Sequence, residues 1–342
     1  MQDVIIVGAG PAGLRCASLL ESEGLDVLVI EARKEIGTPV QCSGLVSRNL
    51  DKFLKPPSSC IEHRVKGALI HGPEGRELEL MKPCTAAYVL DRRAFDSFLA
   101  ERVSSSMLLD TTVKSISISS SVTVKTTKGD FKSRALLGCD GPSSVVRRHF
   151  RVRPVETLQG VIAITPEPNS SDRVELWLDR EVCDGFLWKI PRGKATEYGM
   201  LGSSVNLSQL QGFFRLKDIQ KRRAGMIPVG PCKSFFERTL LVGDAAAQTK
   251  PWSGGGVVYS MTCAAHAAST LTHCLRAKEL SEQALSCYED AWKAELERPI
   301  SMGMMGRELY REMDNRSLVK LMDSLKSMDL NSLDMDFPIL EL

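Results

Sequence analysis

The sequence predicts an α/β fold, and three stretches of the chain carry that prediction. The first is an apolar run at residues 4–7, which leads through a glycine-rich turn into a helical pattern at 14–23 and a second apolar run at 27–30. The second is a strand-rich stretch at 158–204, and the third is a return to buried strands and long helices from residue 239 onward. Together they indicate a Rossmann-like domain, a strand-rich cap and C-terminal helices.

The turn between the first strand and the first helix reads Gly8-Ala9-Gly10-Pro11-Ala12-Gly13. In such a turn the first glycine makes the tight bend, the second lets the backbone approach a pyrophosphate, and the third lets the helix pack against the strand. The helix N-terminus supplies N–H groups for phosphates. Glu31 ends the second strand, where its carboxylate can accept hydrogen bonds from a ribose diol. The stretch predicts dinucleotide binding; the alternative is a glycine-rich turn in an ordinary βαβ unit.

The composition is typical of a globular enzyme. The chain has 342 residues, of which 43% are hydrophobic and 25% charged, and its formal net charge is +2. This charge argues neither for nor against an anionic partner, and we expect no nucleic acid. The cysteines form no C-x-x-C pair and the histidines show no ligand spacing, so we expect no metal. A strand beginning at residue 4 leaves no room for a cleavable leader, so we expect reduced thiols and a cytoplasmic protein.

Two later segments repeat the pattern of a strand that ends in an acid. Residues 138–147 read Gly-Cys-Asp-Gly-Pro-Ser-Ser-Val-Val-Arg, and residues 241–246 read Leu-Val-Gly-Asp-Ala-Ala. Acids at the carboxyl ends of strands face the ligand crevice of an open α/β sheet, which makes Asp140 and Asp244 candidates for a cofactor site. A tight turn alone would explain Asp140. The glycines at 254–256 precede a helix and offer N–H groups to a negatively charged, reduced ring.

These elements predict three parts of the chain. A discontinuous cofactor-binding domain comprises residues 1–157 and 225–280, a strand-rich substrate cap comprises 158–224, and a C-terminal helical segment comprises 281–342. Within the first part, residues 46–53 predict a helix. The basic clusters at 147–151 and 217–223 predict solvated faces, and contact with anionic lipid headgroups is the alternative. Residues 257–275 predict a buried helix of small residues instead of a membrane span.

Several of these motifs resemble those of a known superfamily. The glycine turn with Glu31, the Asp91-Arg92 pair and the segments 138–147 and 241–246 resemble the para-hydroxybenzoate hydroxylase superfamily of FAD proteins. Within it, the chain is most similar to the geranylgeranyl reductase family, on three segments: Pro39-Val40-Gln41-Cys42-Ser43-Gly44-Leu45, Phe186-Leu187-Trp188-Lys189-Ile190-Pro191, and Tyr288-Glu289-Asp290-Ala291-Trp292-Lys293. Phe186 and Ile190 depart from the family, which usually has Tyr and Phe there; this departure bears on the lipid substrate and not on the flavin.

The resemblance implies FAD as the cofactor and assigns residues to each part of it. The AMP half and the diphosphate are assigned to Ala12, Gly13, Glu31 and Arg33, with Arg92 at the diphosphate and Val113 beside the adenine. Asp244 is assigned to the ribityl chain or the diphosphate side. The flavin ring is assigned to the backbone of Gly256 and Val257 and to Cys42, Ser43 and Leu45. The other predicted cofactor residues are Gly8, Gly10, Ala32, Asp140, Gly243 and Gly255. The predicted substrate residues are Trp188, Pro191 and Trp252.

The resemblance further implies reduction of isoprenoid carbon–carbon double bonds, in geranylgeranyl or other polyprenyl groups of lipids. An isolated alkene accepts hydride poorly, so its reduction requires a proton at one carbon and a hydride at the other. Cys42 is the candidate proton donor, because a free thiol with a pKa of about 8.5 stays protonated at neutral pH. The alternatives are that Cys42 is a small packing residue and that Trp188 belongs to the core.

The remaining expectations concern partners and rival functions. No second strand–glycine–helix unit for NAD(P) occurs in the sequence, so we expect an external electron donor, which is NADPH, ferredoxin or a deazaflavin. An isoprenoid lipid substrate implies peripheral contact with a membrane. The rival functions are a flavin-dependent aromatic hydroxylase of the same superfamily and a non-catalytic flavin- or lipid-binding protein.

Overall fold

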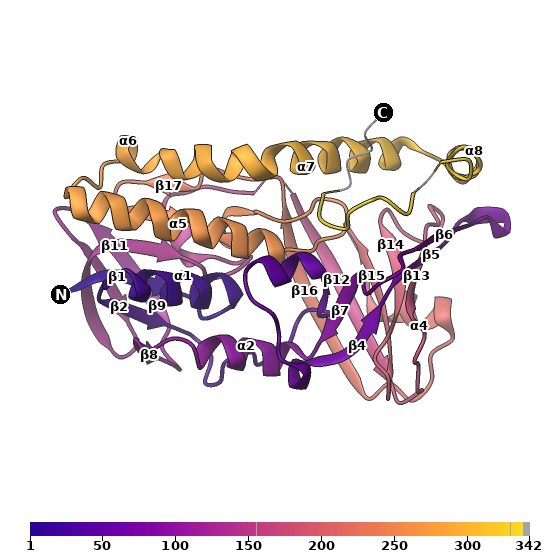
Figure 1. Cartoon of the computed structure of the whole chain (residues 1–342), viewed down its shortest axis with the longest axis horizontal. Coiled ribbons are helices and arrows are strands. Elements are labelled where there is room, and N and C mark those ends of the chain that lie inside the picture. The colour runs from indigo at the N-terminus through magenta and orange to yellow at the C-terminus, as the bar shows by residue number, and fades with distance from the viewer. Residues whose placement is uncertain (155, 329, 338–342) are drawn as a thin grey trace. The chain divides into compact units, whose positions relative to one another are not determined.

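Figure 1 shows the computed structural model of the chain, which describes residues 1–154, 156–328 and 330–337. The chain divides into two compact units, and each is described by itself. The first unit comprises Met1–Pro39, Arg93–Glu156 and Pro228–Ser301. The second comprises Val40–Arg92, Thr157–Ile227 and Met302–Leu342.

The first unit is built on a mostly parallel sheet in the order β17-β18-β11-β1-β2-β8, and β10 and β9 extend it from β11. Strand β1 pairs in parallel with β2 on one side and with β11 on the other, as a βαβ nucleotide-binding unit requires. The strands are β1 Gln2–Val7, β2 Val27–Ile30, β8 Ser106–Leu108, β9 Val113–Ile118, β10 Val122–Thr126, β11 Gly129–Gly138, β17 Phe235–Phe236 and β18 Thr239–Leu241. The predicted fold class is confirmed.

The first unit also contains helices, and two of them pack closely because one has a buried face rich in small residues. Helix α1 packs on α5, and the buried face of α5 includes Ala264, Ala267 and Ala268. The helices are α1 Pro11–Ser22, α2 Arg92–Ala100, α3 Val145–His149, α5 Val257–Ala277, α6 Glu282–Leu285 and α7 Cys287–Glu312, and η4 Gly243–Ala246 is a 3₁₀ turn. Among the described residues, none of the helices is both long and apolar enough to cross a membrane.

The second unit contains a seven-stranded sheet in the order β16-β12-β15-β14-β13-β5-β6 and a small sheet in the order β3-β7-β4. The strands are β3 Leu45–Ser47, β4 Ile61–Val65, β5 Gly67–His71, β6 Glu77–Met81, β7 Ala87–Leu90, β12 Glu156–Thr165, β13 Arg173–Trp177, β14 Phe186–Pro191, β15 Thr196–Gly202 and β16 Lys221–Val229. The helices are α4 Leu207–Phe214 and α8 Asn315–Leu325, with short 3₁₀ turns η1 Arg48–Lys52, η2 Ser58–Cys60 and η3 Pro73–Gly75. This sheet is the predicted strand-rich cap.

Three expectations differ from the observed structure. Residues 46–53 form no α-helix: the chain is extended in β3 and then makes the 3₁₀ turn η1, because β3 pairs with β7. The predicted boundaries also place residues 40–92 in the first domain, whereas β5 pairs in parallel with β13 and so joins this segment to the cap sheet. The helical segment predicted at 281–342 is divided between the two units, since α7 continues past Ser301.

Candidate cofactor site and cysteine loop

The turn between β1 and α1 requires glycine at two positions. Gly8 has φ +102°, and a Cβ added to it would lie 2.4 Å from the carbonyl oxygen of Cys139. A Cβ on Gly13 would lie 2.0 Å from the carbonyl oxygen of Gly8. These two glycines therefore allow the close contact of α1 with the strand ends, as the sequence predicts.

Gly10 has a different role, because space lies beside it. Apart from Gly10 and its two chain neighbours, no described residue has an atom within 4 Å of the position that a Cβ would occupy on Gly10. Gly10 is also the N-cap of α1 and gives no side-chain cap to the first turn, where Pro11 occupies the first helical position. An uncapped helix N-terminus with open space in front of it fits a diphosphate group.

Glu31 lies at the end of β2 and links two backbone segments. Its carboxylate accepts hydrogen bonds from the backbone N–H of Ala9 at 2.8 Å and from that of Arg33 at 2.7 Å. Its own backbone pairs with Leu108 and Thr111, which brings the start of β9 beside it. The carboxylate oxygens retain lone pairs for a ribose. Ala32 and Arg33 are exposed, whereas Val113 packs in the core under the sheet.

Asp140 acts as the cap of helix α3. Its carboxylate accepts hydrogen bonds from the Ser144 hydroxyl at 2.5 Å and from the backbone N–H groups of Val145 at 2.6 Å and Val146 at 3.2 Å. Burial raises the pKa of Asp140, and these hydrogen bonds oppose the rise in part. A tight turn, which is the simpler explanation of Asp140, is therefore present. A cofactor contact for Asp140 stays a prediction.

The Asp244 turn lies against the first turn of α1. Gly243 has φ +69°, and a Cβ added there would lie 3.2 Å from Cβ of Ala12. A Cβ on Gly256, the N-cap of α5, would lie 2.9 Å from Oδ1 of Asp244. The first unit thus brings together the Gly10 turn, Asp244 and the glycine-rich start of α5, although more than two hundred residues of sequence separate the Gly10 turn from the other two.

Sequence reasoning missed three residues that hold the Asp244 turn. Arg147 is 5% exposed and donates hydrogen bonds to the carbonyl oxygens of Asp244 at 3.2 Å and Ala245 at 2.9 Å. The prediction of a solvated face is therefore wrong for Arg147. It is also wrong for Arg223, which is half-buried and donates to the carbonyl oxygen of Cys42 at 2.9 Å. Gln248 accepts from the backbone N–H of Gly243 at 2.7 Å and donates to the Tyr288 hydroxyl at 3.0 Å. The signal for Arg147 is its place at the end of the 138–147 motif.

The cysteine loop lies in the second unit and has a fixed backbone. Sγ of Cys42 accepts a hydrogen bond from the backbone N–H of Gly44 at 3.4 Å. Gly44 has φ +78°, and a Cβ added to it would lie 2.3 Å from the carbonyl oxygen of Leu90. The N–H of Leu90 in turn donates to the carbonyl of Gly44 at 2.9 Å. Only glycine at position 44 allows this contact with the end of β7.

A buried ionic network lies beside this loop. Arg192 donates to the carboxylates of Glu62 at 2.7 Å and Glu197 at 2.9 Å, and the indole N–H of Trp188 donates to Glu197 at 3.1 Å. Arg192 also donates to the carbonyl oxygen of Ser43 at 2.6 Å. The Glu197 side chain is fully buried; burial raises its pKa, while the charge of Arg192 and the N–H of Trp188 lower it in part.

The structure shows where the predicted substrate residues Trp188, Pro191 and Trp252 lie. Trp188 is 9% exposed, and a Cβ on Gly199, its partner in β15, would lie 2.0 Å from the indole ring. The glycine thus makes room for the ring on this face of the sheet. Pro191 is buried at the end of β14, and Trp252 is half-buried in the first unit. A substrate contact for these residues stays a prediction.

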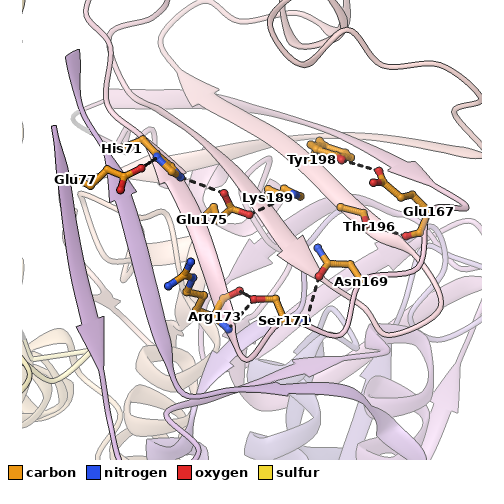
Figure 2. A network of polar contacts seen from close by, with 10 residues as sticks. All are labelled: His71, Glu77, Glu167, Asn169, Ser171, Arg173, Glu175, Lys189, Thr196 and Tyr198. Carbon is orange, nitrogen blue, oxygen red and sulfur yellow. Dashed lines mark hydrogen bonds and ion pairs between the residues drawn. The ribbon is translucent and has the colours of Figure 1, made fainter. Parts of the chain in front are cut away.

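A second polar network occupies the other face of the same sheet (Figure 2). His71 contacts Glu77 at 3.0 Å and Glu175 at 3.1 Å, and the Tyr198 hydroxyl donates to Glu167 at 2.9 Å. Because successive side chains of a strand alternate between faces, Tyr198 points away from its neighbour Glu197. Burial raises the pKa of Tyr198. This network is separate from the hydrogen bonds of the cysteine loop.

Comparison with known proteins agrees with this geometry. A family model described as lycopene cyclase protein matches residues 3–168. A digeranylgeranylglycerophospholipid reductase of Methanococcus vannielii is 26% identical, over 94% of this chain and 90% of the relative. The fold matches that of a geranylgeranyl bacteriochlorophyll reductase-like protein from Thermoplasma acidophilum with a TM-score of 0.90 and 23% identity, over 98% of this chain and 94% of the other.

A halogenase solved in complex with FAD shares the fold with a TM-score of 0.74 and 14% identity, over 98% of this chain and 87% of that one. The chain therefore resembles proteins named digeranylgeranylglycerophospholipid reductases over nearly its whole length, and its fold is that of a geranylgeranyl reductase-like protein and of an FAD-binding halogenase. This confirms the resemblance predicted from the motifs.

Proposed function

We propose that this protein is an FAD-dependent reductase of isoprenoid carbon–carbon double bonds, in geranylgeranyl or other polyprenyl groups of lipids. The observation that carries the proposal is sequence similarity over 94% of the chain to a protein named for the reduction of a digeranylgeranyl lipid. The turn at Gly10, with open space in front of an uncapped helix, supports a dinucleotide cofactor. The ordered loop around Cys42 supports a defined reaction site.

The residues of the first unit fit FAD. The N–H groups at the start of α1 would bind the diphosphate, and Glu31 would accept from the adenosine ribose. Asp244 would bind the ribityl side, with the N–H groups of Gly256 and Val257 at the flavin ring. The resemblance also assigns Arg92 and the loop residues Cys42, Ser43 and Leu45 to FAD; these four residues belong to the second unit. When bound in its reduced form, FAD supplies a hydride.

Cys42 supplies the proton in this proposal. Its S–H bond breaks as a C–H bond forms at one alkene carbon, and the hydride goes to the other carbon, so that the double bond gains one proton and one hydride. The N–H of Gly44 donates to Sγ of Cys42 at 3.4 Å, and a hydrogen bond of this kind stabilises the thiolate that remains. Solvent then returns the proton to the thiolate.

The partners follow from this chemistry. The substrate is an isoprenoid or prenylated lipid, and the electrons come from an external donor, which is NADPH, ferredoxin or a deazaflavin. A cytoplasmic protein with peripheral access to a membrane suits a lipid substrate of this class.

Anaerobic reoxidation distinguishes this function from its rivals. The purified protein is reduced with dithionite, geranylgeranyl diphosphate or a prenylated lipid is added, and the flavin absorbance is followed. Reoxidation without oxygen supports the reductase. Stable reduced flavin with prenyl substrates, combined with NADPH-dependent oxygen uptake with a phenol, would establish an aromatic hydroxylase instead. A flavin that no substrate of either class reoxidises would indicate a binding protein.

A further inference from the structure

Two arginines hold the carbonyl groups of the cysteine loop. Arg192 donates through Nη1 to the carbonyl oxygen of Ser43 at 2.6 Å, and Arg223 donates through Nη1 to that of Cys42 at 2.9 Å. Both arginines come from strands or strand ends of the cap sheet, β14 and β16. Two consecutive carbonyls bound in this way fix the directions of the two peptide planes that follow Cys42, one on each side of Ser43.

Arg192 itself is fixed on every side of its guanidinium group. Nε donates to Glu62 at 2.7 Å, Nη1 donates to Glu197 at 2.9 Å, and Nη2 donates to the carbonyl of Leu90 at 3.4 Å. Its side chain is 4% exposed. Only the planar fork of arginine reaches this set of acceptors at once, and an ammonium group at the same place would reach fewer of them.

Glu197 anchors the arginine to the sheet. Its side chain is fully buried, and a buried carboxylate is costly unless it is paired and hydrogen-bonded. Arg192 pairs with it, and the Trp188 indole N–H satisfies its other oxygen at 3.1 Å. Burial lowers the pKa of Arg223, and the nearby carboxylate of Glu197 opposes this shift in part.

We propose that Arg192 is a positioning residue. It contacts Glu197, which is held by Trp188, and it binds the carbonyl of Ser43, so that it holds the Cys42 thiol where it reacts. The proposal gives the Trp188 segment a role besides packing: the tryptophan orients Glu197, Glu197 orients Arg192, and Arg192 orients the loop. Its consequence for reaction rests on the proposed function, because Cys42 must be the proton donor, whereas the loop's dependence on Arg192 stands apart from any activity.

The loop is tested by amide hydrogen exchange of the purified full chain, read on a peptide that covers residues 40–46. Arg192→Lys keeps the charge and loses the fork, and we expect exchange of this peptide to become faster on the order of tenfold, as for the loss of a hydrogen bond to a charged group. The matched control is Tyr198→Phe, which removes the bond to Glu167 from the next residue after Glu197, on the other face of β15. It should leave the loop peptide unchanged.

Exchange that is unchanged in Arg192→Lys, or equally faster in Tyr198→Phe, would overturn the proposal. Trp188→Phe keeps an aromatic ring in the core and removes one bond to Glu197, so it provides a milder second variant with a smaller acceleration expected. If Arg192→Lys does not fold, the Trp188→Phe result decides.

Single-turnover flavin reoxidation tests the consequence for the reaction. Arg192→Lys should slow the reaction in the parent protein and bring no further loss in the Cys42→Ala background, because the arginine acts through the thiol. If Arg192→Lys slows flavin reoxidation by the same factor in the parent protein and in the Cys42→Ala protein, the arginine does not act through the thiol. If Cys42→Ala turns over at the parent rate, the catalytic role of Cys42 fails while the exchange result for the loop stands.

Discussion

At the scale of single residues, two glycines of the β1–α1 turn have different roles. Gly13 is required for close packing, and Gly10 is proposed to bind the cofactor. Gly13 has a backbone oxygen 2.0 Å from its missing Cβ, whereas Gly10 has open space and an extended backbone with φ −80° and ψ −178°. A valine fits that backbone conformation. The two positions therefore respond differently to a side chain.

Gly10→Val should give a folded, colourless protein, because its branched side chain fills the space that a diphosphate requires. Gly13→Ala is the matched comparison, and its clash with the turn should cost about 1–3 kcal/mol of folding free energy. Thermal melting and the flavin content after purification measure the two effects. Stoichiometric FAD in Gly10→Val would show that the diphosphate lies elsewhere.

Cys42→Ala should leave the fold and the bound FAD intact and slow flavin reoxidation by the prenyl substrate by ~10²-fold or more, a usual scale for an acid catalyst. Cys42→Ser keeps the size of the side chain and should also be slow, because a hydroxyl is a much poorer proton donor. Anaerobic single-turnover kinetics measure both variants. A parent rate in Cys42→Ala would make this cysteine a packing residue.

At the scale of elements, α7 anchors the Asp244 turn. The Tyr288 hydroxyl donates to the carbonyl of Leu241 at 2.9 Å and accepts from Gln248, and the Trp292 indole donates to the Ser234 hydroxyl at 3.0 Å. Both aromatic rings are almost fully buried. The segment 288–293, which marks the family resemblance, thus has a structural role within the first unit.

Tyr288→Phe should lower the free energy of unfolding by about 1–3 kcal/mol, since Gln248 and the Leu241 carbonyl lose a buried partner. Urea unfolding measures this loss. An unchanged midpoint would show that the hydroxyl contributes nothing to the anchor.

Glu289 makes this anchor sensitive to acid. Burial alone would raise the pKa of Glu289, but the hydrogen bonds from Lys293 and Ser234 outweigh burial and lower it. A lowered folded-state pKa contributes stability above the ordinary glutamate pKa, and this contribution is lost as the pH falls through the folded value. Glu289→Gln should therefore have a lower free energy of unfolding than the parent at neutral pH, and the difference between the two should decrease in acid. Urea unfolding at several pH values measures this difference. A difference that stays constant or increases in acid would contradict the role of Glu289.

The elements also show what a sequence can predict and what it cannot. The strands 4–7 and 27–30 and the glycine turn are local patterns, and all are found in place. Residues 46–53 fail as a helix because pairing of β3 with β7, a contact between distant segments, overrides the local pattern. Arg147 and Arg192 could not be assigned for the same reason: their acceptors are backbone carbonyls that only the fold brings near.

At the scale of the whole molecule, the chain is divided into two compact units of different composition. The first contains the dinucleotide elements, and the second contains the cysteine loop and the network that fixes it. Each is built from segments that alternate along the sequence, so that residues 40–92 serve the cap although they follow the first βαβ unit.

The most direct test of the central claim is the mass of the product. The protein is purified with its flavin, reduced anaerobically and mixed with a geranylgeranyl lipid, and the lipid is extracted and analysed by mass spectrometry. The proposed function predicts a mass gain of one molecule of hydrogen for each double bond reduced, at the expense of the reduced flavin and strongly diminished in Cys42→Ala. An unchanged lipid beside reduced flavin, or a lipid that gains oxygen in air, would contradict it.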